Sequence, residues 1–365
     1  MLPLPIQISS EKAMQELVDY NSKVVLGMKT LSQIHTDDVV VGCSEREPVY
    51  KEDKLVLYHF KPLVENKDLH KTPILIVYAL VNRPYMADLQ ENRSLIRNLL
   101  KLGMDIYIID WGYPGREDRW LDLDDYINGY VDNCVDAVRE IHGLDKINML
   151  GICQGGVFSL CYTATHQEKI QNLVTMVAPI DFHVSGSLLN DWVGCTLDTP
   201  AMDPDIIAEA MGNVPGDFMN FGFLMLNPFQ LNIQKYVALA NIMDDEDKLK
   251  NFIRMENWIF DSPDQAGEAW REFIKEFYFK NKLIKGEIEI GGKSVDLGNI
   301  KVPVLNLYAE KDHLVPPAST KALGKYIGTD DYTVKGFATG HIGMYVSGKV
   351  QRDLPPTIAD WYKER

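Results

Sequence analysis

Five short runs of β-branched and apolar residues, separated by longer helix-like stretches, constrain the fold of this chain most strongly. They begin at Pro73, Asp105, Ile147, Asn172 and Pro303, and their sequences are PILIVYAL, DIYIID, INML, NLVTMV and PVLNLYA. Residues 122–143 place apolar side chains three and four positions apart and end at a glycine, which predicts an amphipathic helix. Strands that alternate with helices favour an α/β fold with a mostly parallel central sheet flanked by helices.

The segment from Asp181 to about Gly292 has a different composition. Met, Phe, Trp and Pro are scattered there among acidic residues, and no apolar run is typical of a parallel core strand. No internal repeat or Gly/Ser-rich linker separates this segment from the rest. We therefore expect residues 1–180 and 293–365 to form the α/β core, and residues 181–292 to form an inserted, mainly helical cap.

Charge and composition exclude several classes of protein. Hydrophobic residues make up 46% and charged residues 24% of the chain, as in ordinary globular proteins, and the net charge of −15 argues against binding to nucleic acid phosphates. The N-terminus lacks the pattern of a secretory signal, and no apolar run is long enough to span a membrane. We expect a cytoplasmic protein without a membrane span, whose cysteines are reduced: Cys43, Cys134, Cys153, Cys161 and Cys195.

The hexapeptide Gly151-Ile152-Cys153-Gln154-Gly155-Gly156 lies between the predicted strand at Ile147 and a helix-like stretch, VFSLCYTATH. This is the context of a nucleophile elbow, in which glycines let the sharp turn pack against its neighbours. The N-terminus of the following helix favours a thiolate. We predict an α/β-hydrolase fold with Cys153 as the nucleophile, in preference to a buried structural thiol, whereas Cys161 on the same helix is expected in the core.

Chain order supplies the acid and the base, because α/β-hydrolases present nucleophile, acid and histidine in that sequence. Asp312 follows the last predicted strand, and His341 lies between two glycines near the C-terminus. We predict His341 as the general base and Asp312 as its partner. The alternatives are His313 as the base and Asp312 as a turn-capping residue.

The oxyanion hole should consist of two backbone N–H groups. We assign them to Gln154, the residue after the nucleophile, and to Val81 in the loop after the strand PILIVYA. Arg83 in the same loop is a candidate contact for an anionic substrate, although a surface salt bridge is the more common role of a loop arginine.

These motifs resemble the catalytic subunit of polyhydroxyalkanoate (poly(3-hydroxybutyrate)) synthases, specifically the short class III type, which works with a second subunit. The resemblance covers nearly the whole chain. The class IV synthases have a similar length, but their elbow is more often G-x-C-M-G. The matching segments are ILIVYALVNRPYMADLQ at 74–90, IIDWGYPG at 108–115, LDDYINGYVDNCVD at 123–136, LGICQGGVFSLCYTA at 150–164, MENWIFDSPDQAGE at 255–268, LYAEKDHLVPP at 307–317 and GHIGMYVSGK at 340–349.

The resemblance implies an acyltransferase that polymerises (R)-3-hydroxyacyl-CoA, mainly 3-hydroxybutyryl-CoA, on polyester granules in the cytoplasm, with release of coenzyme A. It implies no cofactor or metal, and its catalytic triad matches Cys153, Asp312 and His341. It also implies a homodimer and a complex with a non-catalytic second synthase subunit. Residues 1–35 or the C-terminal segment from Leu354 are candidate binding sites for that subunit, although the C-terminal helix is expected to pack on the core.

A thiolate suits this reaction because sulfur is both a strong nucleophile and a good leaving group in thioester exchange. His341 would deprotonate Cys153 and later the 3-hydroxyl of the incoming substrate, while Asp312 would either orient His341 or activate that hydroxyl. Two other functions share part of the evidence. One is a cysteine hydrolase of esters or thioesters with the same fold, and the other is a non-catalytic, granule-associated protein.

Overall fold

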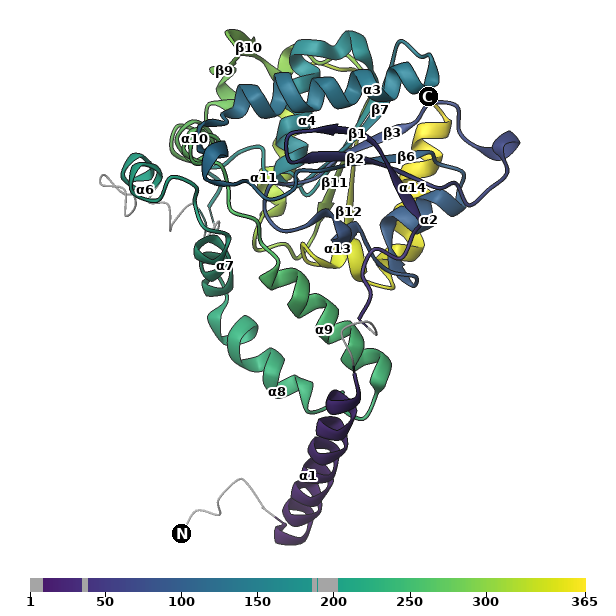
Figure 1. The fold of residues 1–365 in the computed structure, drawn as a ribbon, viewed down its shortest axis with the longest axis vertical. Coiled ribbons are helices and arrows are strands. Elements are labelled where there is room, and N and C mark those ends of the chain that lie inside the picture. The colour runs from purple at the N-terminus through teal and green to yellow at the C-terminus, as the bar shows by residue number, and fades with distance from the viewer. Residues whose placement is uncertain (1–8, 35–38, 186–188, 190–202) are drawn as a thin grey trace. The chain divides into compact units, whose positions relative to one another are not determined.

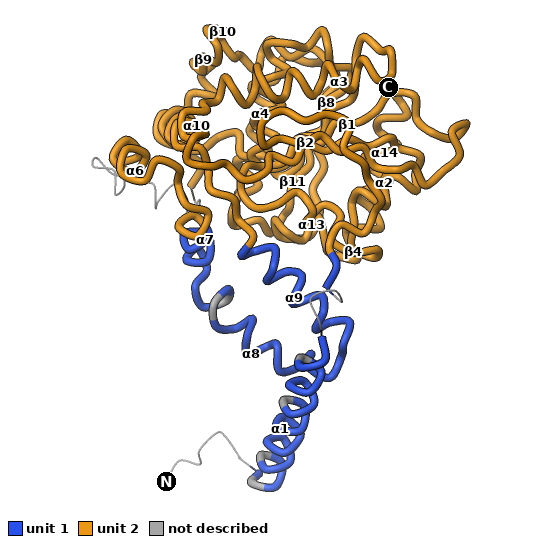
Figure 2. The backbone as a smooth tube through the Cα atoms, viewed as in Figure 1, with its two compact units in different colours: residues 1–40, 220–260 blue, residues 41–219, 261–365 orange. Residues whose placement is uncertain are grey.

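The chain divides into two compact units (Figure 2). The smaller comprises Met1–Val40 and Asn220–Phe260, and the larger comprises Val41–Met219 and Asp261–Arg365. The structure, a computed structural model, describes residues 9–34, 39–185, 189 and 203–365. Cys195 and parts of the expected cap and N-terminal segment lie outside these residues. The expected cap contributes residues to both units, and its boundaries at 181 and 292 remain a prediction.

Eight strands form one sheet in the described part of the larger unit, in the order β1-β2-β6-β3-β7-β8-β11-β12. Neighbours from β6 to β12 are parallel, and β1, β2 and β6 pair antiparallel at one edge. The five predicted strands correspond to β3, β6, β7, β8 and β11, which confirms the mostly parallel sheet. The bounds are β1 Arg46–Glu52, β2 Leu55–Phe60, β3 Ile74–Val77, β6 Ile106–Asp110, β7 Ile147–Ile152, β8 Ile170–Met176, β11 Val304–Ala309 and β12 Tyr332–Phe337.

Helices cover both faces of this sheet (Figure 1). The predicted helix at 122–143 is confirmed as a π-helical segment, η5, continued by α3, and Gly143 ends it with a left-handed backbone. Two small hairpins, β4–β5 and β9–β10, lie outside the main sheet. The remaining bounds are β4 Asp88–Gln90, β5 Arg93–Ser94, β9 Ile288–Ile290, β10 Lys293–Val295, α2 Leu95–Lys101, η5 Asp125–Val131, α3 Asp132–His142, α4 Gln154–His166, α6 Pro204–Met211, α10 Gly267–Glu272, η8 Phe273–Phe279, α11 Pro317–Lys321, α12 Leu323–Tyr326, α13 Gly343–Val346 and α14 Val350–Lys363.

The central strands are buried on both faces. Leu75 and Val77 of β3 belong to a core cluster that includes side chains of η5, α3 and α4, while Ile74, which points to the opposite face, is equally buried. Burial on both sides explains the continuous apolar runs in the sequence. On α14, Ile358 and Trp361 are buried, so this helix packs on the core as expected.

Buried polar side chains link adjacent central strands. Asn172 Nδ2 of β8 donates to Asn148 Oδ1 of β7 at 2.9 Å, and these two residues are direct partners in the sheet register. Thr175 Oγ1 of β8 donates to Asn306 Oδ1 of β11 at 3.0 Å, again between register partners. Because buried amides need hydrogen-bond partners, these contacts favour one alignment of β7, β8 and β11 over any other.

Residues 261–292 contribute to the core of the larger unit rather than standing apart from it. Ala266, Phe273 and Phe277 pack in the same cluster as α3 and α4. Phe273 and Phe277 also stack on each other, and both contact Phe182 edge-on. This part of the expected cap is therefore structurally continuous with the sheet domain.

The smaller unit is helical in its described part. It contains α1 Ser10–Gln33, the end of α7 (Gly216–Met225), η7 Gln230–Gln234, α8 Lys235–Leu239 and α9 Glu246–Phe260. Gly27 gives α1 close access to Met243, since a Cβ at Gly27 would lie 2.1 Å from that side chain. None of the described helices is long and apolar enough to cross a membrane.

Candidate active site

Cys153 occupies the sharp turn between β7 and α4. Its backbone has φ 55° and ψ −123°, a conformation that side-chain-bearing residues rarely adopt. The turn fits only because its neighbours are glycines: a Cβ at Gly155 would lie 2.2 Å from the Val77 carbonyl oxygen, and one at Gly156 would lie 2.6 Å from Ala178. The strained geometry of a nucleophile elbow is thus present at the predicted position.

Asp312 and His341 form a buried pair in the loops that follow β11 and β12, at the same end of the parallel strands as Cys153. His341 Nδ1 lies 2.7 Å from Asp312 Oδ2. The other carboxylate oxygen, Oδ1, accepts hydrogen bonds from the backbone N–H groups of Leu314 and Val315 at 3.0 and 2.9 Å. Asp312 therefore caps its own turn and also binds the imidazole, so the two roles considered for it from sequence are compatible.

The Cys153 sulfur lies close enough to the imidazole of His341 to affect its pKa. Burial alone would lower the pKa of His341, but the Asp312 carboxylate and the Cys153 sulfur outweigh it and raise that pKa to about 10. His313, the alternative base, is an exposed residue of the loop. The structure thus brings Cys153, His341 and Asp312 together in that order and leaves His313 outside the group.

The two candidate oxyanion donors lie on adjacent segments. The side chain of Gln154 accepts a hydrogen bond from the Leu80 N–H at 3.1 Å, which ties the loop after β3 to the elbow. The hydrogen bonds found among the described residues include none donated by the backbone N–H of Gln154 or Val81. Their role as oxyanion donors stays a prediction.

Arg83 has structural partners instead of facing an open anion site. Its guanidinium donates to Asp110 Oδ2 at 2.8 Å and to the Gly112 carbonyl oxygen at 2.9 Å, and it stacks on the ring of Tyr113 at 4.3 Å. The salt-bridge interpretation is confirmed, although the pair is largely buried rather than on the surface.

Two tyrosines beside the site belong to the matching segments 74–90 and 340–349, but nothing in those segments assigns them to the site. Tyr78 and Tyr345 are buried with ring centroids 6.3 Å apart, and Tyr345 lies 6.4 Å from the His341 ring. Burial raises the pKa of both tyrosines. The Cys153 sulfur adds to this effect for Tyr78, and Tyr78 adds to it for Tyr345, so both hydroxyls stay protonated at neutral pH. They place two buried, neutral side chains beside the site.

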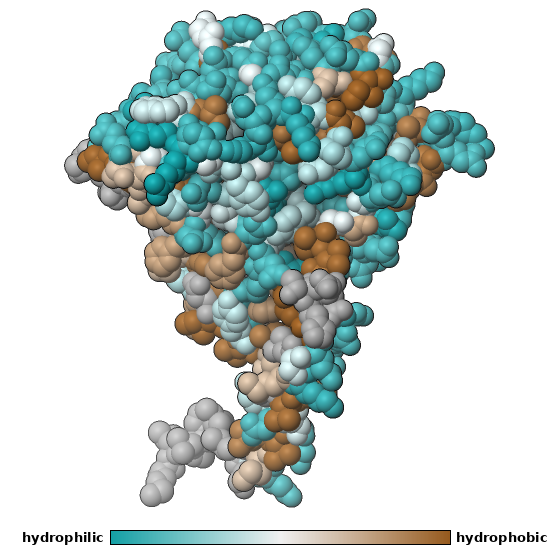
Figure 3. Space-filling view, viewed as in Figure 1, coloured by the Kyte–Doolittle hydropathy of each residue, from teal (hydrophilic) through white to brown (hydrophobic). Residues whose placement is uncertain are grey.

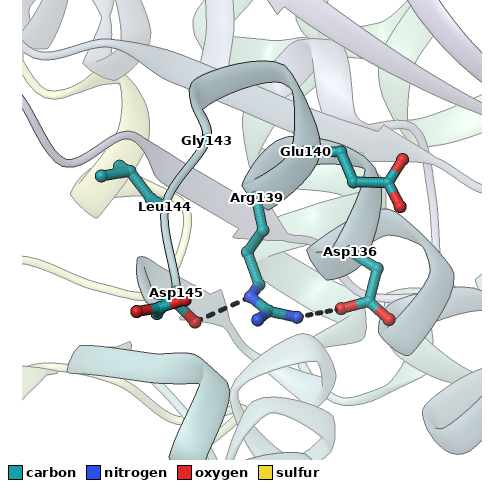
Figure 4. Close-up of a pocket in the computed structure, with 6 residues that line it drawn as sticks. All are labelled: Asp136, Arg139, Glu140, Gly143, Leu144 and Asp145. Atoms are coloured by element: carbon teal, nitrogen blue, oxygen red, sulfur yellow. Dashed lines mark hydrogen bonds and ion pairs between the residues drawn. The ribbon is translucent and has the colours of Figure 1, made fainter.

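A surface pocket at the opposite end of the parallel strands does not contribute to this site (Figure 4). It lies where α3 leads into β7, and Arg139 crosses it to bond Asp136 and the Asp145 carbonyl oxygen. In the described ranges, no three or more His, Cys, Asp or Glu side chains are grouped so that they could hold a metal ion.

Comparison with known proteins extends over the whole chain. Residues 72–347 match the model of the alpha/beta hydrolase fold family. The poly(3-hydroxyalkanoate) polymerase subunit PhaC of Synechocystis sp. is 58% identical over 366 residues, covering 100% of this chain and 96% of the relative. The subunit of the same name from Thiocystis violacea is 53% identical, covering 99% of each chain.

Among solved structures, a putative lipase from Sulfolobus solfataricus matches with a TM-score of 0.51 at 12% identity, covering 87% of this chain and 97% of the lipase. At this identity the likeness concerns the fold alone. The family expected from the sequence motifs is confirmed by the relatives that match from end to end. The chain therefore belongs to the alpha/beta-hydrolase fold family and, within it, to the PhaC subunits of the poly(3-hydroxyalkanoate) polymerases.

Proposed function

We propose that this enzyme polymerises (R)-3-hydroxyacyl groups, mainly 3-hydroxybutyryl, from their coenzyme A thioesters, through an acyl thioester on Cys153. The observation that carries the proposal is the buried Asp312–His341 pair beside a cysteine on a strained elbow. It occurs in a chain that is 58% identical to a protein named as a polymerase subunit. No other cofactor is required, because the thioester itself activates the acyl group.

In the acylation step, His341 takes the proton of Cys153 and the sulfur attacks the thioester carbonyl carbon. The carbonyl oxygen becomes an oxyanion that accepts hydrogen bonds from the N–H groups of Gln154 and Val81, each of which contributes about 3 kcal/mol in comparable sites. The intermediate collapses by breaking the bond to the coenzyme A sulfur, which leaves with the proton held by His341. The raised pKa of His341 favours this proton-holding form.

In the elongation step, the 3-hydroxyl of an incoming 3-hydroxyacyl group attacks the carbonyl carbon of the Cys153 thioester. His341 removes the hydroxyl proton, and the Cys153 sulfur leaves as the new ester bond forms. Asp312 already uses one oxygen for two backbone N–H groups and the other for His341. Its geometry therefore favours orientation of His341 over direct activation of the hydroxyl.

The proposed function includes three associations: with a second, non-catalytic subunit, with another copy of this chain, and with the surface of cytoplasmic polyester granules. The relatives are named as subunits. Within the smaller unit, α1 leaves several large apolar side chains more than half exposed, and Figure 3 shows hydrophobic patches along it: Met14, Leu17, Val18, Val25 and Met28. These residues fall in the segment 1–35 expected to bind a partner, and an apolar face of this size favours such a contact.

The decisive test is incubation of the purified chain with 3-hydroxybutyryl-CoA. We expect release of coenzyme A together with insoluble polyester. Release of coenzyme A with free 3-hydroxybutyrate would instead identify a thioester hydrolase. No turnover, alone or with the second subunit of the same host, would identify a non-catalytic protein.

A further inference from the structure

Two residues directly after α9, Asp261 and Ser262, hold the loop that follows β3. The hydroxyl of Tyr85 donates to Asp261 Oδ2 at 3.0 Å, and the hydroxyl of Tyr113 donates to Asp261 Oδ1 at 2.6 Å. Asn82 Nδ2 donates to Ser262 Oγ at 2.6 Å. Burial and then the hydrogen bond to Asp261 raise the pKa of Tyr113 to about 12, so its hydroxyl remains a donor at neutral pH.

The other side of the same loop is fixed by the turn after β6. Arg83 binds Asp110 and the Gly112 carbonyl oxygen, and it stacks on Tyr113, the residue that also donates to Asp261. Gly112 packs closely against the backbone of Lys54, because a Cβ at this position would lie 2.3 Å from the Lys54 carbonyl oxygen. The loop after β3 is thus held between a rigid turn and the segment that follows α9.

Val81 lies between two restrained residues of this loop. On one side, the Leu80 N–H is bound to the Gln154 side chain. On the other, Asn82 has φ 58°, a left-handed conformation that is uncommon for a residue with a side chain, and its amide is bound to Ser262. The orientation of the Val81 N–H is therefore set by Gln154 from one direction and by Ser262 from the other.

The segment that supplies Asp261 and Ser262 is itself well anchored in the larger unit. Val214 and Gln265 exchange two backbone hydrogen bonds of 2.9 Å, and Gly216 N–H donates to Asp264 Oδ1 at 2.9 Å. Only a glycine fits at position 216, since a Cβ would lie 2.0 Å from the Ser262 carbonyl oxygen. Residues 261–265 therefore form a firm support for the loop and not a loose connection.

We propose that Asp261 and Ser262 are positioning residues that hold the Val81 N–H where the oxyanion forms. This inference rests on the proposed function, because it takes the Val81 N–H as a donor to the thioester oxygen. The two residues act through Asn82, Tyr85 and Tyr113 and do not touch the reacting atoms. Loss of either one should leave Cys153, His341 and Asp312 in place while weakening stabilisation of the transition state.

The experiment compares two reactions of the same sulfur in each variant. Acylation of Cys153 by 3-hydroxybutyryl-CoA in a single turnover builds up charge on a carbonyl oxygen, whereas alkylation by iodoacetamide does not and needs only a reactive thiolate. The variants are Asp261→Ala, Ser262→Ala and Tyr113→Phe. The matched control is Asp205→Ala, which removes a carboxylate of α6 that pairs with Lys275 and Arg271 instead.

For Asp261→Ala we expect acylation to slow by about 10- to 100-fold, with kcat and kcat/KM reduced equally, while the alkylation rate of Cys153 is unchanged. Ser262→Ala and Tyr113→Phe should show the same pattern with smaller losses, and they test the idea even if Asp261→Ala folds poorly. Wild-type acylation rates in the folded variants would overturn the inference, and so would equal losses of acylation and alkylation. Acylation that persists in Cys153→Ala would instead refute the proposed function.

Discussion

In the described part of the larger unit, two carboxylate–imidazole pairs of the same length lie at opposite ends of the strands of one sheet; one is buried and the other is partly buried. Asp312 Oδ2 lies 2.7 Å from His341 Nδ1 after β11 and β12, and Asp105 Oδ1 lies 2.7 Å from His59 Nε2 just before β6 begins. A short contact between the two groups therefore does not by itself identify a catalytic site. The neighbours of the two pairs differ. Cys153 adjoins the first pair, whereas no cysteine is among the described contacts of the second pair.

The second pair belongs to a closed cluster. Tyr107 stacks on His59 with ring centroids 4.3 Å apart, and its hydroxyl lies 2.9 Å from His142 Nε2, which in turn lies 3.4 Å from Asp105 Oδ2. Burial, partly opposed by Asp105, lowers the pKa of His142, whereas the pKa of His341 is raised. The same two side-chain types thus serve packing in one place and, in the proposed function, proton transfer in the other.

The largest expected effect is that of Cys153→Ala. It removes the atom that accepts the acyl group, so coenzyme A release from 3-hydroxybutyryl-CoA should fall to background while the fold is retained. Cys161→Ala is the matched control, because Cys161 is fully buried on the same helix and should affect the unfolding midpoint but not turnover. Substantial turnover in Cys153→Ala would contradict the nucleophile assignment.

The next effect separates the two histidines. His341→Gln should lower turnover on the order of 10²–10⁴-fold, because it removes the general base. His59→Gln and His313→Gln should keep wild-type turnover, since neither residue adjoins Cys153. Steady-state coenzyme A release measures all three, and equal losses in His341→Gln and His59→Gln would show that the comparison of the two pairs is mistaken.

Asp312→Asn should cost less than His341→Gln, about 10²-fold, because the imidazole remains but is less well oriented. Asp105→Asn should leave turnover unchanged and lower the free energy of unfolding by about 1–3 kcal/mol, through loss of charge-assisted hydrogen bonds. Single-turnover acylation and polymer growth should fall together for Asp312→Asn. A loss confined to polymer growth would assign Asp312 to the incoming hydroxyl instead.

The smallest expected effect is a pH dependence of the free energy of unfolding, which has opposite signs for His341 and His142. Because the pKa of His341 rises from 6.5 to about 10 on folding, its contribution to stability is complete below pH 6.5 and is lost as the pH rises towards 10. The pKa of His142 falls below 6.5 on folding, so its contribution is present above pH 6.5 and is lost as the pH falls. Denaturant unfolding of His341→Gln should therefore lose a slope on the alkaline side, and that of His142→Gln a slope on the acid side. Identical pH profiles for the two variants would contradict this assignment.

Sequence predicted those parts of the molecule whose signal is local. Central strands buried on both faces give continuous apolar runs, and the elbow at Cys153 combines glycines and cysteine within six residues. The edge strands β1 and β12, and β2 next to β1, carry partly exposed side chains, so they have no such run and are not predicted. Residues 181–292 are expected to form a mainly helical cap, but the sequence does not predict that Ala266, Phe273 and Phe277 pack in the core of the larger unit.

Chain order and loop context predict Asp312 and His341, which the structure pairs, whereas they do not predict the contacts that hold the loop after β3. Tyr85 and Tyr113 meet Asp261 across 176 and 148 residues. A tyrosine or an aspartate at such a separation carries no local pattern that distinguishes it from other surface residues. Such contacts exist only once the chain has folded, so a single sequence cannot reveal them.

The buried amides between β7, β8 and β11 also fix the strand register on which the geometry of the candidate active site depends. A slip of one residue between β7 and β8 would displace Cys153 by about 3.3 Å relative to the strands that carry Asp312 and His341, and would turn the slipped side chains to the other face. It would also separate Asn148 from Asn172 and break the hydrogen bond between their buried side chains. Accurate assembly of the nucleophile, acid and base thus depends on polar groups that take no part in the chemistry.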